Sequence, residues 1–270
     1  MIVCAKTRKT HCQSVGSTKT IRSQLCIMHN IINLYYSIAY LSLSIRNLYK
    51  FKFDRCLHRE GDAMTSLEMR ENPLFMRNSF EGSGKWEIPI IKKQEIPLEN
   101  VRLIAYSDTK KNDRPQNTAC GVHFFVDDYR FTGIYNHPER SLEKLSQYAF
   151  LLTPDYSTYS DMKYWRQLES IAHSRWVGAY WQSRGLKVIP TMTWSDSGSY
   201  SFCNDGVEKG CIVAVGMIGC KHEKEYFLRG YNTMLEIVEP VAVICLGDPF
   251  KEMDGNLIVV DYRASRKVVR

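Results

Sequence analysis

Short apolar runs recur along this chain, most of them ending in or beside an aspartate, and this pattern constrains the fold more than any other feature. In VHFFVDDYRF, residues 122–131, the apolar run stops at two adjacent acids. Nearly continuous hydrophobicity over about five to eight residues is typical of strands buried on both faces of a parallel sheet. We therefore expect strands at residues 86–91, 101–108, 122–128, 149–155, 186–194, 211–219, 241–248 and 257–262.

Segments with helical spacing separate several of these runs. The expected helices lie at residues 138–147, 161–185 and 222–240. Pro138 stands in the first turn of the first segment, Gly185 ends the second, and Pro240 ends the third. Strands that alternate with helices predict the α/β class and favour a (β/α)8-like barrel, irregular in its first units. A doubly wound open sheet is the alternative, although no GxGxxG or Walker pattern supports it.

The distribution of charge divides the chain at Met64. The formal net charge is +7, and residues 1–63 alone carry ten Lys and Arg against three Asp and Glu, so residues 64–270 are neutral overall. A neutral body argues against a non-specific nucleic-acid binder, whose affinity comes from neutralised phosphates. Arg-Glu-Gly before Met64 can be encoded by purine-rich codons that resemble a bacterial ribosome-binding site. We expect residues 1–63 to be a translated leader outside the native fold, and residues 64–270 to form a single α/β domain.

Residues 27–45 are mostly apolar and allow a membrane anchor as the alternative to a leader. His29, Asn30 and Asn33 interrupt this stretch, whereas a spanning helix needs about 20 apolar residues with few polar ones. We therefore expect no membrane association.

The five cysteines after Met64 show no CxxC spacing and lie mostly in or beside apolar runs. Such cysteines are typical of buried thiols in a cytoplasmic protein. We expect neither a metal nor another cofactor, with zinc at Cys220 and His222 as the alternative.

The acids that follow the apolar runs are the candidate catalytic residues: Asp127, Asp155 and Asp248. The carboxyl ends of parallel strands gather on one side of an α/β domain, so these side chains should lie close together. Like charges in a low-dielectric site raise one pKa, so that one acid can hold a proton while another stays ionised. This combination suits transfer at a sugar carbon. The alternative for any one of them is a helix cap or a solvated loop charge.

Four further side chains are candidate binding residues: Asp128, Trp194, Asp196 and Arg175. Successive side chains of a strand point to opposite faces, so Asp127 and Asp128 cannot both face the interior of a barrel. Arg175 belongs to HSRWVGAYWQSR, residues 173–184, whose aromatic side chains could stack on a base. The alternative is an aromatic stripe that faces the core, with the arginine packed over it.

The sequence resembles a family of bacterial and phage proteins known as domain of unknown function 4417. The resemblance rests on HFFVDDYRF, LLTPDYS, RSLEKLSQY, SRWVGAYWQSRGLKVIPTMTWSDSGSYSFC and VAVICLGDPF, and it covers residues 95–263. It implies an association with phages and mobile elements, without an established activity.

The order of motifs is also similar to that of the tRNA-guanine transglycosylase barrels. Asp127 and Phe131 keep an Asp-x-x-x-Phe spacing of those enzymes, and Asp155 ends the following strand. The likeness implies acid/base work for Asp127, base binding for Asp155 and nucleophilic attack by Asp248. The small Ser-Gly after the first aspartate and the cysteine-rich zinc motif are both missing here.

From the sequence we expect a phage or mobile-element enzyme that uses strand-end carboxylates on a nucleoside, nucleotide or sugar-containing substrate. The alternative is a non-enzymatic accessory protein for element replication or transfer, with nucleic acid or a protein as its partner. The substrate, the product and the oligomeric state stay open.

Overall fold

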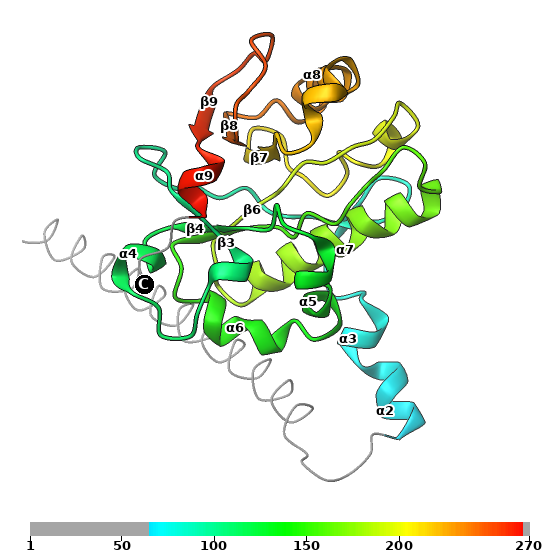
Figure 1. Cartoon of the computed structure of the whole chain (residues 1–270). Coiled ribbons are helices and arrows are strands. Elements are labelled where there is room, and N and C mark those ends of the chain that lie inside the picture. The colour runs from blue at the N-terminus through cyan, green and yellow to red at the C-terminus, as the bar shows by residue number, and fades with distance from the viewer. Residues whose placement is uncertain (1–64, 267–270) are drawn as a thin grey trace, which may run out of the picture. The chain divides into compact units, whose positions relative to one another are not determined.

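The chain divides into two units, residues 1–69 and residues 70–270, and the computed structural model describes residues 65–266. The expected leader, residues 1–63, lies outside the described residues. Among the described residues, the sheets and the two longest helices belong to the second unit (Figure 1).

Four short parallel strands form the first sheet. In sheet order, which is also chain order, they are β3 (Leu103–Ala105), β4 (Gly121–His123), β5 (Phe150–Leu152) and β6 (Val188–Ile189). Ile104 pairs with Val122, and Leu152 pairs with Ile189. Every residue of these strands is buried, as the continuous apolar runs predict.

Three parallel strands form the second sheet, in the order β7 (Ile212–Gly216), β8 (Ala242–Leu246) and β9 (Leu257–Val260). A parallel bridge between Thr191 and Ala214 joins the end of β6 to β7. Around it, the Ala214 N–H donates to the Pro190 carbonyl (2.9 Å), and the Met192 N–H donates to the Ala214 carbonyl (2.8 Å). The parallel strands thus follow one another in chain order across both sheets.

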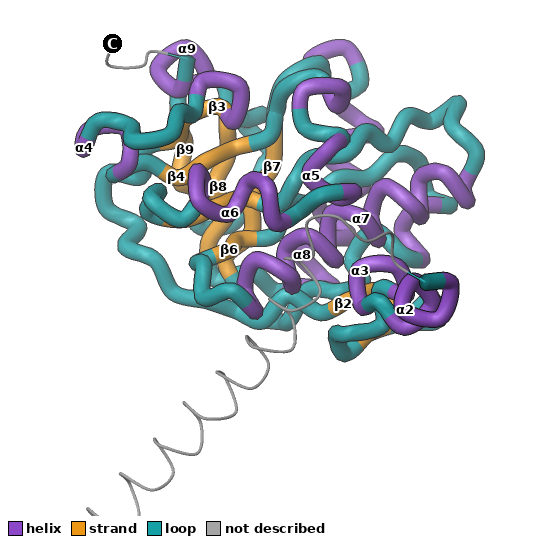
Figure 2. Tube along the Cα trace, turned by 90° about the horizontal axis from the view of Figure 1, so that it is seen from below, coloured by secondary structure: helices purple, strands orange, loops and turns teal. Residues whose placement is uncertain are grey.

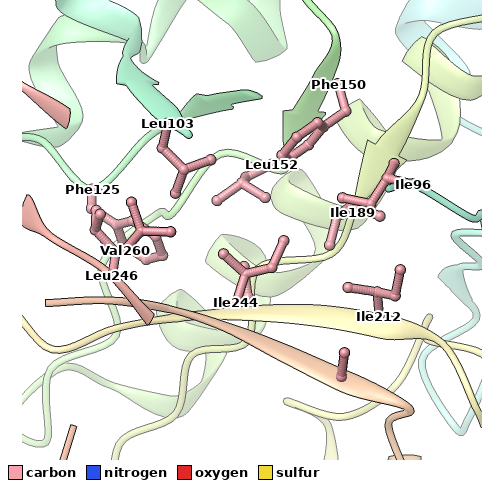
Figure 3. Packing of buried hydrophobic residues seen from close by; sticks show 12 residues of the cluster. Ile96, Leu103, Phe125, Phe150, Leu152, Ile189, Ile212, Ile244, Leu246 and Val260 are labelled. Atoms are coloured by element: carbon pink, nitrogen blue, oxygen red, sulfur yellow. The ribbon is translucent and has the colours of Figure 1, made fainter. Parts of the chain in front are cut away.

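The inner side chains of the two sheets meet in one hydrophobic cluster (Figure 3). Leu103 and Leu152 come from the first sheet, and Ile244 and Leu246 from the second. A filled barrel interior would contain similar layers. However, no ladder pairs β9 with β3 in the part of the chain that the structure describes. The α/β class is confirmed, whereas the closed (β/α)8-like barrel is not, because the sheet stays open.

Side chains connect the two sheet edges where strand pairing is missing. Helix α9 (Tyr262–Ser265) follows β9 directly and packs against β3. Nε2 of His123, the last residue of β4, lies 3.1 Å from Ser265 Oγ, whose hydroxyl donates to the Tyr262 carbonyl (2.7 Å). The Phe125 N–H donates to His123 Nδ1 (3.2 Å), so Nε2 carries the proton of a neutral imidazole.

The first expected strand, residues 86–91, contributes to a hairpin. Here β1 (Gly82–Ser83) and β2 (Ile88–Pro89) pair antiparallel. Pro89 has no N–H to donate to a central ladder, which restricts this segment to a short edge pairing. Ile88 is buried and belongs to a cluster with Ile171 of helix α7 (Tyr164–Ser183).

Within residues 65–266 the two longest helices are α7 and α8 (Lys224–Val238), which lie within the helical segments that the sequence predicts. A left-handed residue follows each of them: Gly185 has φ +83°, and Glu239 has φ 49° just before Pro240. Figure 2 shows the strands gathered together and the helices around them.

The other helices in the described part of the chain are short. They are α2 (Ser66–Glu71), α3 (Pro73–Met76), α4 (Pro115–Thr118), α5 (Gly133–Asn136) and α6 (Glu139–Leu145), with 3-10 turns η1 (Tyr106–Asp108), η2 (Asp128–Arg130), η3 (Ser199–Ser201) and η4 (Cys220–His222). Within residues 65–266, no helix combines the length and the apolar character that crossing a bilayer requires.

Candidate functional site

The loops after β4 and β5 bring two carboxylates together, Asp128 and Asp155, which we name the carboxylate pair. Asp128 begins η2, and Asp155 stands three residues after the end of β5. The Ser157 N–H donates to Asp128 Oδ2 (3.0 Å), and the Ser157 hydroxyl donates to Asp128 Oδ1 (2.9 Å). These bonds fasten one loop to the other and hold the Asp128 carboxylate within electrostatic range of Asp155.

Asp155 has the properties of a proton-exchanging group. Its residue surface is partly exposed, yet protein closely surrounds the carboxyl group. Burial raises the pKa of Asp155 to about 7; the negative charge of Asp128 acts in the same direction, and the positive charge of Arg175 opposes both. Among residues 65–266, no hydrogen bond or ion pair engages this carboxyl group. Such a group can hold or release a proton at neutral pH.

Arg175 lies in the interior, with none of its surface exposed. Its Nε donates to the Asp205 carbonyl (3.2 Å), and its two terminal nitrogens donate to the carbonyls of Thr191 (2.8 Å) and Cys203 (3.1 Å). The remaining N–H groups point to Ser174 Oγ and Met192 Sδ. All the donors of the guanidinium therefore have protein acceptors. Arg175 cannot bind a ligand directly, contrary to its expected role, and it acts on the site through its charge.

Asp127 lies outside the carboxylate pair. Its side chain is 70% exposed, and its Oδ2 lies 3.6 Å from Nε of Arg130. The strand ends at His123, and a tight turn at residues 124–126 follows, so the alternation of faces expected along an extended strand no longer applies. The structure therefore places Asp128, and not Asp127, in the pair.

Trp194 and Asp196 fix the loop after β6 to neighbouring helices. Trp194 packs on Phe227 of α8 with ring centroids 5.1 Å apart, and it leaves no room for a side chain at Gly230. Asp196 accepts from the Tyr164 hydroxyl (3.1 and 3.2 Å) at the start of α7. Both residues are expected from the sequence to bind a ligand, whereas in the structure their side chains contact neighbouring helices.

Asp248 and Cys220 follow the strands of the second sheet. Asp248 is exposed after β8. Burial raises the pKa of Cys245 to about 12, with further contributions from the charges of Cys220 and Asp248. Burial also raises the pKa of Cys220 to about 11, and the charge of Asp155 adds to this effect. The charges that act on the Asp155 pKa are those of Asp128 and Arg175, and Asp248 is not among them.

Sequence reasoning missed two neighbours of the carboxylate pair, Ser157 and Cys220. Ser157 stands two residues after Asp155 in LLTPDYS, and Cys220 follows directly after the apolar run at residues 211–219. Both positions lie just beyond expected strands, where side chains of adjacent loops can meet. The sequence suggests a buried thiol at Cys220, with zinc binding as the alternative. Residues 65–266 contain no group of three or more His, Cys, Asp or Glu placed to hold a metal.

Comparisons with known proteins find phage relatives. Residues 80–263 match a family described as Domain of unknown function (DUF4417). The chain is similar to the Gene 1 protein of Mycobacterium phage L5, with 35% identity over 178 residues, 64% of this chain and 76% of the relative. It is also similar to the Gene 1 protein of Mycobacterium phage D29, with 32% identity over 177 residues, 64% of this chain and 65% of the relative. No solved structure matches, and the likeness to transglycosylase barrels is not confirmed.

Proposed function

This chain belongs to the DUF4417 family, and we propose that it carries out acid/base chemistry at a sugar carbon with strand-end carboxylates. The observation that supports the proposal is the Asp155 carboxyl group: it is closely surrounded by protein in a partly exposed residue, it is unpartnered among the described residues, and it has a pKa of about 7 beside a second carboxylate. The substrate would be a nucleoside, a nucleotide or another sugar-containing compound. The reaction would be hydrolysis or exchange of its glycosidic bond.

Asp155 would act as the general acid. In its protonated form it would donate the proton to the leaving base or sugar oxygen as the glycosidic bond breaks. The water or alcohol that then adds to the sugar carbon would return a proton to the carboxylate. Asp128, held by Ser157, would stabilise the positive charge that develops on the sugar ring.

Two further residues complete the proposal. Asp248, exposed at the end of β8, would attack the sugar carbon if the reaction passes through a covalent intermediate. Arg175 is a positioning residue, because its buried charge limits the rise of the Asp155 pKa without touching the substrate.

The test is an activity screen of the full chain on nucleosides, nucleotides and simple glycosides, with product detection by mass spectrometry. Asp127 provides a matched control, since it is an acid on the neighbouring strand loop but 70% exposed and outside the pair. We expect Asp155→Asn to lower kcat/KM by about 100-fold or more and Asp127→Asn to leave it nearly unchanged. Equal losses in the two folded variants would contradict the assignment. A wild-type chain that binds nucleic acid and converts none of these compounds would favour the accessory role instead.

A further inference from the structure

Four aromatic side chains are exposed on the segments that carry or directly follow the carboxylate pair. Tyr129 (72% exposed) follows Asp128, while Tyr159 (61%), Tyr164 (52%) and Trp165 (69%) lie between Asp155 and the first turn of α7. We name these four residues the aromatic platform. Most aromatic side chains in the hydrophobic runs are buried. Exposed aromatic side chains that gather on two segments indicate a binding surface.

The platform is connected to the carboxylate pair by hydrogen bonds. The Ser157 hydroxyl donates to Asp128 and lies 3.2 Å from the Tyr159 hydroxyl. The Tyr159 carbonyl accepts from Gln167 Nε2 (3.1 Å), a buried side chain of α7. A ligand that stacks on Tyr159 would therefore lie next to the group that holds Asp128.

Cationic side chains flank the rings, and one of them, Arg166, pairs with Glu169 (2.5 Å). Residues 163–166 read Lys-Tyr-Trp-Arg, and the guanidinium of Arg130 lies over the Tyr129 ring at 5.1 Å from its centroid. Lys163 is exposed and makes no ion pair among the described residues, and Arg130 has only a loose pair with Asp127 at 3.6 Å. Exposed rings with interleaved cations suit a ligand that has flat bases and a few phosphates.

We propose that the aromatic platform binds a single-stranded stretch of nucleic acid and presents one of its nucleotides to the carboxylate pair. The inference rests on the proposed function and narrows its substrate class to a nucleotide within a strand. Bases of a single strand are free to stack on tyrosine and tryptophan, whereas those of a duplex are not. The neutral charge of residues 64–270 agrees with a short contact that uses few phosphates. A neutral glycan could also stack on such rings but would make no use of the charge of Lys163.

The experiment compares binding of the full chain to a short single-stranded oligonucleotide, its duplex and a neutral oligosaccharide. Residues 1–63 are basic and can add affinity of their own, so the informative quantity is the ratio between variants. We expect Tyr164→Ala/Trp165→Ala to weaken single-strand binding by about 10-fold or more and Lys163→Ala to reduce the salt slope by about 0.7. Trp86→Ala is the matched control: this tryptophan is 50% exposed with Lys85 over its ring, but it lies on the β1–β2 turn.

The outcomes separate the platform from the chemistry. Equal single-strand affinity of the platform variant and the wild type, or preference for the duplex or the oligosaccharide, would overturn the inference. Retained single-strand binding without any turnover would support the platform while contradicting the proposed function. Turnover of free nucleosides that the platform substitutions do not affect would support the proposed function and contradict the platform.

Discussion

Ser157 donates both its backbone N–H and its hydroxyl to the Asp128 carboxylate, at 3.0 and 2.9 Å. The two residues belong to different strand loops, and this contact brings Asp128 within range of Asp155. This arrangement gives a role to acids that follow apolar strands. The strands lie in the hydrophobic core, and the loops at their carboxyl ends bring Asp128 and Asp155 together.

Ser157→Ala should impair the carboxylate pair more than the fold. The backbone N–H bond remains, but loss of the hydroxyl bond frees one Asp128 oxygen, with a stability cost of about 1 kcal/mol. We expect kcat/KM to fall by about 10-fold while the unfolding midpoint changes little. Ser201→Ala is the control, since Ser201 is exposed and bonds only to the nearby Gly198 carbonyl. Unchanged activity in Ser157→Ala would show that Asp128 needs no such support.

Arg175→Met should destabilise the chain strongly. The carbonyls of Thr191, Cys203 and Asp205 would lose a charged donor in the interior. Such losses cost about 3 kcal/mol or more together. Urea unfolding measures the change, and Arg140→Met on the exposed surface should cost less than about 0.5 kcal/mol. Similar unfolding midpoints for the two variants would show that the hydrogen bonds of Arg175 to the interior carbonyls do not stabilise the fold.

His123 predicts a loss of stability in acid. Burial lowers the pKa of His123 to about 3, with a further contribution from the charge of Arg266. Because the unfolded chain binds this proton near pH 6.5 and the folded chain does not, stability should decrease as the pH falls from about 6.5 to about 3. The full effect is about 5 kcal/mol. Below that window both states are protonated and the contribution no longer changes.

The difference between wild type and His123→Gln isolates this effect from other titrating groups. Urea unfolding across the acid range should give a shallower pH dependence for His123→Gln. His137→Gln is the control, because His137 is half-exposed. Parallel curves for wild type and His123→Gln would rule out a buried neutral imidazole.

Asp155 predicts the opposite pH dependence. Its raised pKa means that the folded chain keeps a proton that the unfolded chain releases above about pH 4. The contribution of this group to stability is present below about pH 4 and is lost as the pH rises through about 7. The free energy of unfolding of Asp155→Asn, relative to that of the wild type, should therefore be higher at about pH 8 than at about pH 5. A constant difference at both values would count against a perturbed Asp155.

The sequence predicts Asp155 correctly as a strand-end acid because the run before it is a buried strand, and the α/β class follows from the same pattern. It cannot choose between Asp127 and Asp128, since that choice depends on a turn after His123 that ends the strand early. Local sequence patterns also cannot predict whether the sheet closes, because closure depends on hydrogen bonding between β9 and β3, which are far apart in the sequence. The sequence suggests that Arg175 binds a ligand because it does not reveal which acceptors surround the side chain. Those acceptors include the carbonyls of Thr191 and Cys203, which lie on later segments of the chain.

An NMR titration of the aspartate side-chain carboxyl carbons measures directly whether Asp155 exchanges a proton near neutral pH. Comparison with Asp155→Asn assigns the resonance. We expect a midpoint of about 7 for Asp155, which should fall when Asp128→Asn removes the neighbouring charge. A midpoint near 4, unaffected by Asp128→Asn, would contradict this expectation.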